Sequence, residues 1–182
     1  MGEAVNLVNN FKVEKVIFNF GNFNTLETEL IKLLKIKKIK YYSCIKELNK
    51  DKYKLMFLNT KEYDNENDNS NVIYMEVNGF KFLFMGDAGI EKEDILDKYN
   101  LSNIDVLKVG HHGSKTSSSK SFINEINPKY SLISVGENNR YGHPKESVLD
   151  ILKSSKIYRT DRDGSIEVRL NDKGYRIRNC EP

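Results

Sequence analysis

The sequence predicts an α/β domain built on a sheet that contains parallel strands. Apolar, strand-like runs three times end at a glycine that polar residues follow, at Gly86-Asp87, Gly110-His111 and Gly136-Glu137. Segments of helical character separate these runs, and strands joined through helices normally pair in parallel. An Asn78-Gly79 dipeptide between two apolar runs adds an antiparallel hairpin at the start of the series.

The N-terminal third predicts a strand–helix–strand unit. We expect a short helix over Gly2–Asn10, a strand over Val13–Phe18 and a short strand over Lys40–Ser43. Asn24 and Glu27 have the spacing of a capping box, which places the start of a second helix between these strands. That helix ends in a cluster of three lysines, Lys35, Lys37 and Lys38. Cations stabilise the negative end of the helix dipole, so we interpret the cluster as a solvated helix end rather than a nucleic-acid patch.

The middle of the chain predicts a strand over Tyr53–Leu58 and a polar surface loop over Asn59–Ser70. A calcium loop is the alternative, but the central glycine and final glutamate of an EF-hand are absent from the stretch. The strands flanking Asn78-Gly79 are expected over Val72–Val77 and Phe80–Met85. Asp87 then follows the second hairpin strand, a rigid position for a ligand.

The C-terminal half continues the alternation of strands and helices. Ser114–Ser119 precede one helix as caps, or as an anion site together with its backbone N–H groups, and Pro144 is expected in the first turn of another. The latter has an apolar face made by Val148, Leu149 and Leu152. The expected elements are helices over Glu91–Tyr99 and Lys120–Ile126, and strands over Ile104–Val109, Tyr130–Val135, Lys156–Thr160, Ser165–Leu170 and Tyr175–Arg178, with turns at Asp163-Gly164 and Lys173-Gly174.

Length and composition favour one globular domain over residues 1–182. Hydrophobic residues make up 38% and charged residues 30%, and the net charge of +3 is too small to indicate nucleic acid as a partner. No apolar run approaches the roughly 20 residues that span a bilayer, and no signal peptide is visible. Cys44 and Cys180 show no metal-binding spacing and leave a disulfide open. Compartment and oligomeric state stay undetermined.

The polar groups at the three junctions predict a metal or phosphate site. Carboxyl ends of parallel strands meet at one edge of a sheet, where ligands of open α/β sheets bind. Each junction alone also fits an ordinary turn, but together they hold every histidine of the chain. A carboxylate beside imidazoles suits a borderline divalent ion such as Zn²⁺ or Mn²⁺. The side chains expected to converge are Asp87, His111, His112, Asn139 and His143.

These motifs resemble the metallo-β-lactamase-like domain of the competence protein ComEC. The resemblance is dense from about Val72 to Val168, and secreted teichoic-acid phosphorylcholine esterases look like more distant relatives. It rests on Phe84-Met85-Gly86-Asp87, Asp105 to Ser114 (DVLKVGHHGS), Ile133 to Gly136, Asn139 to Pro144 (NRYGHP), Tyr158 to Asp161, and Asp163-Gly164.

The resemblance implies an αββα sandwich and a two-metal phosphodiesterase. Asp87 would bridge or bind a metal, and His111 or His112, between which the sequence does not choose, would complete the shell of the second. A substrate such as DNA is implied by ComEC, and another phosphoester by the esterases. The residues that would contact the phosphate are Ser114, Lys115, Asn139, Tyr141 and His143, while Ser70 and Asn71 occupy the place of a third histidine in other members.

The family's hallmark, a His-x-His-x-Asp-His-type run, has no counterpart, since no histidine precedes His111. Met1 to Val5 resemble the start of the helix that follows that run. We therefore expect an N-terminally truncated domain that lacks its first strands and main metal motif. A degenerate, non-catalytic binding module is the alternative.

Overall fold

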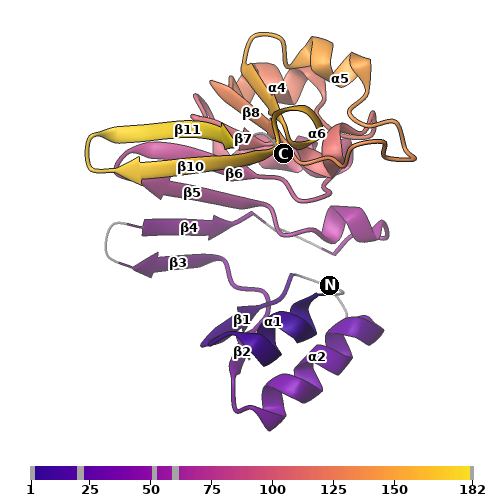
Figure 1. Ribbon diagram of the computed structural model, residues 1–182, viewed down its shortest axis with the longest axis vertical. Coiled ribbons are helices and arrows are strands. Elements are labelled where there is room, and N and C mark those ends of the chain that lie inside the picture. Colours follow the sequence, from indigo (N-terminus) through magenta and orange to yellow (C-terminus); the bar gives the residue numbers. More distant parts are fainter. Residues whose placement is uncertain (1–2, 20–22, 51–52, 59–61, 181–182) are drawn as a thin grey trace.

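A seven-stranded mixed sheet forms the centre of the computed structural model, which describes residues 3–19, 23–50, 53–58 and 62–180 (Figure 1). The strands lie side by side in chain order. Those from β3 to β6 pair antiparallel and those from β6 to β9 pair parallel, which confirms the predicted α/β class. Their bounds are β3 Glu47–Lys50, β4 Tyr53–Phe57, β5 Ile73–Val77, β6 Phe80–Phe84, β7 Val106–Lys108, β8 Tyr130–Ile133 and β9 Lys156–Arg159.

The predicted hairpin joins β5 and β6. Asn78 and Gly79 both have positive φ values, 52° and 81°, as a tight hairpin turn with the right-handed twist of its strands requires. Asn-Gly adopts these dihedrals at low cost, so this part of the fold follows from local sequence alone.

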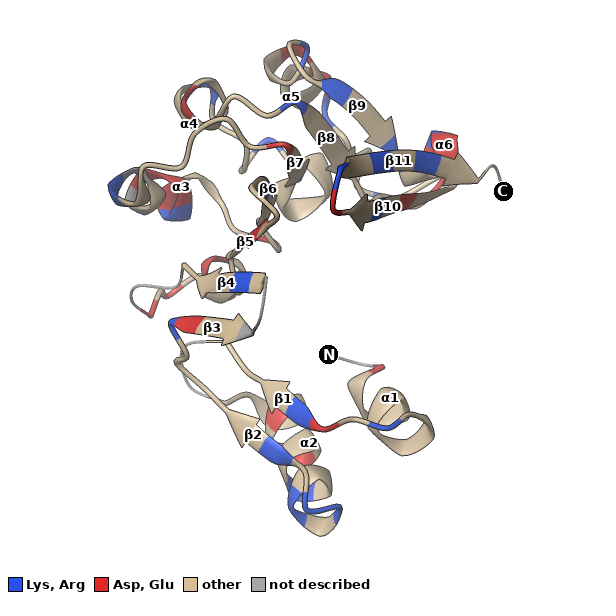
Figure 2. Ribbon diagram, turned by 90° about the vertical axis from the view of Figure 1, so that its left-hand side faces the viewer, with Lys and Arg blue, Asp and Glu red and all other residues tan. Residues whose placement is uncertain are grey.

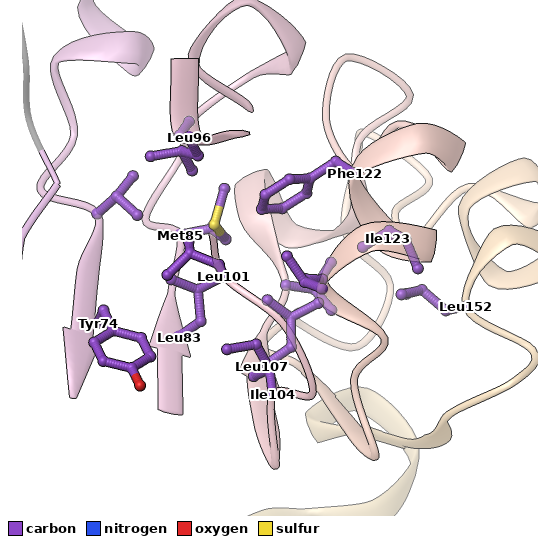
Figure 3. Packing of buried hydrophobic residues seen from close by; sticks show 14 of the residues in the cluster. Tyr74, Leu83, Met85, Leu96, Leu101, Ile104, Leu107, Phe122, Ile123 and Leu152 are labelled. Atoms are coloured by element: carbon purple, nitrogen blue, oxygen red, sulfur yellow. The ribbon is translucent and has the colours of Figure 1, made fainter. Parts of the chain in front are cut away.

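Helices cover one face of the sheet and bury its main core. They are α3 (Ile90–Leu96), α4 (Lys120–Ile126) and α5 (Glu146–Ile151), with the 3₁₀ turn η2 (Asp97–Tyr99) after α3. Figure 3 shows Leu83 and Leu107 of the sheet packed among side chains of the covering segments. Each fully buried aliphatic side chain contributes about 1.5–3 kcal/mol relative to exposure. The core labelled there comprises Tyr74, Leu83, Met85, Leu96, Leu101, Ile104, Leu107, Phe122, Ile123 and Leu152.

The strand–helix–strand unit at the N-terminal end has a core of its own. Strands β1 (Lys15–Ile17) and β2 (Lys40–Tyr42) pair in parallel through α2 (Thr25–Ile36), and α1 (Ala4–Asn10) precedes them. Gly2, the expected start of α1, lies outside the described residues. In Figure 1 this unit lies beyond β3. Its buried side chains are Val8, Phe18, Leu30, Ile31 and Leu34.

Both predicted ends of α2 are confirmed. Asn24 accepts a hydrogen bond from the Glu27 backbone N–H, and the Glu27 carboxylate accepts one from the Asn24 N–H. Figure 2 shows basic residues near the other end of α2, and Lys35, Lys37 and Lys38 are all exposed there. This exposure agrees with a solvated helix end.

The C-terminal hairpin packs on the sheet face opposite the helices. It consists of β10 (Ser165–Asn171) and β11 (Gly174–Cys180), and the Tyr175 ring lies 5.1 Å from that of Phe80 and 5.9 Å from that of Tyr130. The simple turn expected at Asp163-Gly164 is instead the short helix α6 (Thr160–Asp163), which ends where Gly164 has a φ of 67°.

Two further expectations need correction or completion. The polar stretch expected to be a solvated loop contains the 3₁₀ turn η1 (Glu66–Asn69), in which Asp68 and Asn69 are buried at 3% and 7% exposure; residues 59–61 lie outside the described part. Cys44 and Cys180 are both exposed and form no disulfide. In the described part of the chain, no helix has the length and hydrophobicity to span a membrane.

Candidate active site at the carboxyl edge of the sheet

The predicted convergence of Asp87 with the histidines is confirmed. Asp87 follows β6 and His112 follows β7, and parallel pairing brings these strand ends together. The His112 Nε2 lies 3.8 Å from the Asp87 Oδ1, and both side chains are about half exposed. The pair therefore forms an accessible junction of one imidazole and one carboxylate.

The other ring nitrogen fixes the orientation of His112. Its Nδ1 lies 2.6 Å from the Ser134 carbonyl oxygen, just after β8. A carbonyl oxygen only accepts hydrogen bonds, so Nδ1 carries the proton. In the neutral ring the lone pair of Nε2 then faces Asp87, which is the arrangement typical of a metal-binding histidine.

His111 faces a different set of neighbours. Its backbone N–H donates to the Gly86 carbonyl oxygen at 2.9 Å, which ties the histidine loop to the residue before Asp87. Its Nδ1 lies 3.4 Å from the Thr116 hydroxyl, and its ring centre lies 6.2 Å from that of His143. Both histidines of the pair have left-handed backbones, with φ of 44° and 56°, so adjacent residues present their rings to different neighbours.

The turn that carries His143 is organised by Asn139. The Asn139 side-chain amide donates to the carbonyl oxygens of His143 and Gly136, and its oxygen accepts from the His143 N–H. These bonds commit the Asn139 side chain to the turn rather than to an open surface. The Tyr141 ring stacks on that of His143, with centres 5.8 Å apart.

His143 has an unpartnered ring nitrogen. Its Nδ1 is buried and has no hydrogen-bond partner in the described part of the chain. Desolvation lowers the pKa of His143, and Coulombic interactions with Lys145, His111 and His112 lower it further. The surroundings of this ring thus favour its neutral form.

Pro144 docks this turn onto the histidine loop. A Cβ added to Gly113, where φ is 78°, would lie 2.6 Å from the Pro144 Cβ, and the Lys145 N–H donates to the Gly113 carbonyl oxygen. Pro144 is therefore a packing residue ahead of α5, which begins at Glu146 with Lys145 as its N-cap. The expectation that Pro144 lies in the first turn of a helix was wrong. Pro144 precedes α5 and packs against Gly113 instead.

Ser114 and Lys115 differ sharply in accessibility. Ser114 is 6% exposed, and its hydroxyl accepts a hydrogen bond from the Thr116 N–H, so it organises the turn after the histidines. Lys115 is exposed and lines a cleft of about 540 Å³ together with Asp87 and His111.

The protein itself occupies part of the anion site expected at the start of α4. The backbone N–H groups of Ser118 and Ser119 donate to the two oxygens of Glu93, at 2.5 and 2.8 Å. The Ser119 hydroxyl caps the helix by accepting from the Phe122 N–H. Burial raises the pKa of Glu93, and these backbone bonds oppose that rise. The N–H groups of Ser118, Ser119 and Phe122 are therefore already bonded within the protein.

Ser70 supports the Asp87 backbone. Its hydroxyl accepts a hydrogen bond from the Asp87 N–H at 3.0 Å, and a Cβ added to Gly86 would come within 2.8 Å of the Ser70 Cβ. Asn71 and Asp87 also line a second cleft of about 490 Å³, which extends to Asn24 and Glu27 of the N-terminal unit. Ser70 thus helps to fix the position of the Asp87 backbone.

Asp68 lies beside the candidate site and was not singled out from the sequence. Its buried carboxylate accepts hydrogen bonds from the Gly89 N–H at 2.7 Å and from the Asn65 side-chain amide at 3.0 Å. The Ile90 N–H in turn donates to the Thr116 carbonyl oxygen. Three segments distant in sequence are thereby joined around Asp87, and nothing in the local pattern of η1 signals this role.

The donor chemistry fits a divalent metal only in part. A carboxylate oxygen and an imidazole nitrogen suit Zn²⁺ or Mn²⁺, and Asp87 and His112 supply one of each. Across residues 3–19, 23–50, 53–58 and 62–180, no group of three metal-binding side chains is found. Structural and catalytic zinc sites usually take three or four protein ligands, so Asp87 and His112 would supply only part of such a shell.

Comparison with known proteins bears on the identity of this site. The profile of the Metallo-beta-lactamase superfamily matches residues 45–137, about half of the chain. ComE operon protein 3 of Bacillus subtilis is 40% identical over 111 residues, which cover 59% of this chain and 14% of that protein. Competence protein ComA of Neisseria gonorrhoeae is 37% identical over 127 residues, which cover 66% of this chain and 18% of that protein.

Recombination protein 2 of Haemophilus influenzae is 37% identical over 106 residues, covering 58% of this chain and 13% of that protein. The chain thus spans less than a fifth of the length of these curated relatives. A solved structure from Thermotoga maritima, described as a metallo-beta-lactamase superfamily member, matches with a TM-score of 0.42 at 17% identity over 80% of this chain and 70% of that one. With its matching profile and mixed sheet, the chain belongs to the metallo-beta-lactamase superfamily and is similar to ComEC-like competence proteins.

Proposed function

We propose that this domain belongs to a metal-dependent phosphodiesterase, with DNA as the substrate class. The observation that carries the proposal is the Asp87–His112 junction, in which the His112 Nε2 faces a carboxylate oxygen at 3.8 Å while its Nδ1 is anchored on Ser134. Such an anchored imidazole opposite a carboxylate is the expected preparation for a shared cation.

Asp87 and His112 would hold a divalent ion, Zn²⁺ or Mn²⁺. A complete metal centre would hold two such ions. A bound ion of this kind supplies a hydroxide at neutral pH and polarises a phosphoryl oxygen. Ser70 fixes the Asp87 backbone and Ser134 fixes the orientation of the His112 ring, which supports both residues as ligands. This geometry favours His112 over His111 as the partner of Asp87.

The remaining polar groups would act on the phosphate. Lys115 lines the cleft beside Asp87 and is positioned to neutralise a phosphate oxygen. The neutral His143 ring, stacked on Tyr141 and beside His111, would donate or accept a hydrogen bond at the other side of the junction. Ser114 and Asn139 would act indirectly, because their side chains hold the two turns in shape.

DNA is proposed as the substrate because the similar proteins carry competence and recombination names. A phosphoester of the phosphorylcholine type is the alternative substrate. A non-catalytic binding module is a second candidate function, and it is favoured by the finding that the described residues hold no group of three metal-binding side chains. The metal-dependent reaction therefore depends on ligands in addition to Asp87 and His112.

The test compares this chain with a longer form that carries a His-x-His-x-Asp-His-type segment ahead of it. Both are assayed on single-stranded DNA and on bis-p-nitrophenyl phosphate with Mn²⁺ and with Zn²⁺. We expect negligible activity from residues 1–182 and metal-dependent hydrolysis from the longer form, abolished by Asp87→Ala and His112→Ala. A longer form that is folded and loaded with metal, yet inactive on each phosphodiester, would establish the binding-module function instead.

A further inference from the structure

The cleft beside Asp87 has a wall that the site residues discussed so far do not explain. The cleft has a volume of about 540 Å³ and runs from the η1 segment, through Asp87, to Lys115 and Thr116. Its lining combines polar side chains with three carboxylates and one apolar residue, and comprises Asn65, Asn67, Asp68, Asp87, Gly89, Ile90, Glu91, His111, Lys115 and Thr116. The polar character of the walls suits a ligand with several hydrogen-bonding groups better than an apolar one.

Two of these side chains have unused hydrogen-bonding capacity. The Asn67 backbone is held in place, since its N–H donates to the Asn65 side-chain oxygen and its carbonyl oxygen accepts from the Ser70 N–H. The Asn67 side-chain amide and the Lys115 ammonium, however, have no hydrogen-bond or ion-pair partner in the part of the chain that the structure describes. A rigid backbone that presents an uncommitted amide is characteristic of a binding wall.

Asp68 makes this wall rigid. Its carboxylate is 3% exposed and joins the η1 segment to Gly89, two residues beyond Asp87. A Cβ added to Gly89 would lie 3.2 Å from the Asp68 carboxylate and 3.0 Å from the Thr116 carbonyl oxygen, so both walls meet at this glycine. One buried carboxylate thus links the η1 segment, which carries Asn67, to the loop that follows Asp87.

We propose that this cleft is the subsite for the nucleotide next to the scissile phosphate, with Asn67 and Lys115 as its contact residues and Asp68 as the positioning residue. The proposal rests on the proposed phosphodiesterase function and names the part of the substrate that this wall receives. An asparagine amide offers both a donor and an acceptor, which match the hydrogen-bonding edge of a nucleobase or a sugar hydroxyl. The Lys115 cation matches a phosphate and opposes the quaternary ammonium group of a choline ester.

The test measures binding separately from hydrolysis. Amide resonances of ¹⁵N-labelled chain are followed by NMR during titration with the dinucleotide thymidylyl-thymidine, and in a second arm with phosphocholine. We expect the dinucleotide to shift the amides of Asn67, Asp68, Lys115 and Thr116, and phosphocholine to shift them less. Asn67→Ala and Lys115→Ala should each weaken dinucleotide binding by about tenfold, the effect of losing one charge-assisted or well-placed hydrogen bond.

The control variant is Lys120→Ala, which removes an exposed lysine at the start of α4, away from the residues lining the cleft. It should bind the dinucleotide as the parent chain does. The subsite would be overturned if the parent chain did not bind the dinucleotide, or if the dinucleotide shifted amides elsewhere in the chain. It would also be overturned if Asn67→Ala and Lys115→Ala bound the dinucleotide as tightly as the parent chain, or if phosphocholine gave the larger shifts. Hydrolysis of bis-p-nitrophenyl phosphate by the longer form, measured with Asp87→Ala, reports on the proposed function independently, because that small substrate contains no nucleotide.

Discussion

The imidazole of His112 and the carboxylate of Asp87 meet at the carboxyl edge of the parallel strands, with Nε2 and Oδ1 3.8 Å apart. His112 is held from behind by the Ser134 carbonyl oxygen and Asp87 from below by the Ser70 hydroxyl. The His112 ring is thus held by the loop after β8, and the Asp87 backbone by the segment before β5. The following predictions depend on this arrangement and on the contacts that support it.

The chain should bind Zn²⁺ and Mn²⁺ weakly. Two donors at one junction are fewer than the three or four that hold zinc tightly, and we expect dissociation constants above about 1 μM, the value that corresponds to roughly 8 kcal/mol. Isothermal titration calorimetry measures this directly. Sub-micromolar binding that Asp87→Ala removes would show that two described donors are sufficient with water.

His112→Ala should reduce metal binding more than His111→Ala. The Nε2 of His112 faces Asp87, whereas the His111 ring contacts Thr116 and His143. Titration of both variants with Mn²⁺, with the parent chain alongside, gives the comparison. Equal losses would mean that the two imidazoles share one ion, and a larger loss for His111→Ala would reverse the assignment.

Gly113→Ala should destabilise the fold by about 1–3 kcal/mol, the range for a non-glycine residue at a strained positive φ. Its φ is 78°, and the new Cβ would clash with Pro144 at 2.6 Å. Gly136→Ala is the matched control, since a Cβ there meets nothing within 4 Å and the glycine lacks a left-handed φ. Urea denaturation should separate the variants; equal midpoints would mean that Pro144 yields without cost.

Asp161 should stabilise the fold in a pH-dependent way. Two hydrogen bonds from Arg159, at 3.0 and 2.6 Å, lower the pKa of Asp161 below its ordinary value of 3.8. Because the folded pKa is depressed, the contribution is present above pH 3.8 and is lost as the pH falls through the folded pKa. Asp161→Asn should therefore cost about 1 kcal/mol at neutral pH, and less under acid conditions.

Thermal or urea unfolding between pH 2 and pH 7 follows this difference. Asp150→Asn, at an exposed carboxylate on α5, is the control and should change stability little at any pH. A cost for Asp161→Asn that stays constant down to pH 2 would show that the pair acts through packing and not through charge.

Asp68→Asn should loosen the η1 segment without unfolding the domain. The Asp68 carboxylate accepts from both the Gly89 N–H and the Asn65 amide, and an asparagine in its place would turn an N–H₂ group towards one of these donors. Hydrogen exchange should accelerate at Gly89 and in η1, with little change in the sheet. Asp64→Asn, an exposed acid of the same loop, should leave exchange unchanged; equal protection in both variants would remove Asp68 from its positioning role.

Several elements could be predicted because their signals are local. Asn78-Gly79 set the β5–β6 hairpin through left-handed dihedrals, and Asn24 with Glu27 set the start of α2 through bonds three residues apart. The parallel arrangement of β6 to β9 followed from helices between the strands. That topology in turn was enough to bring Asp87 and the histidines to one edge.

The details of the site depended on contacts between distant segments. The Glu93 carboxylate accepts hydrogen bonds from the N–H groups of Ser118 and Ser119, 25 and 26 residues away, and so occupies part of the anion site that the serine-rich segment suggested. Asp68 reaches Gly89 across 21 residues. Neither partner is encoded in a local pattern, because each bond exists only after the sheet and its helices have packed.

The sequence by itself determined the order of most strands and helices, the chemistry gathered at the sheet edge and the family resemblance. Tertiary structure alone decided which histidine faces Asp87. His111 and His112 are adjacent and chemically identical, so composition and spacing treat them alike. Left-handed backbones at both residues direct their rings to different neighbours, and the Ser134 carbonyl oxygen in the loop after β8 orients the His112 ring. These constraints arise only when the neighbouring strand is in place.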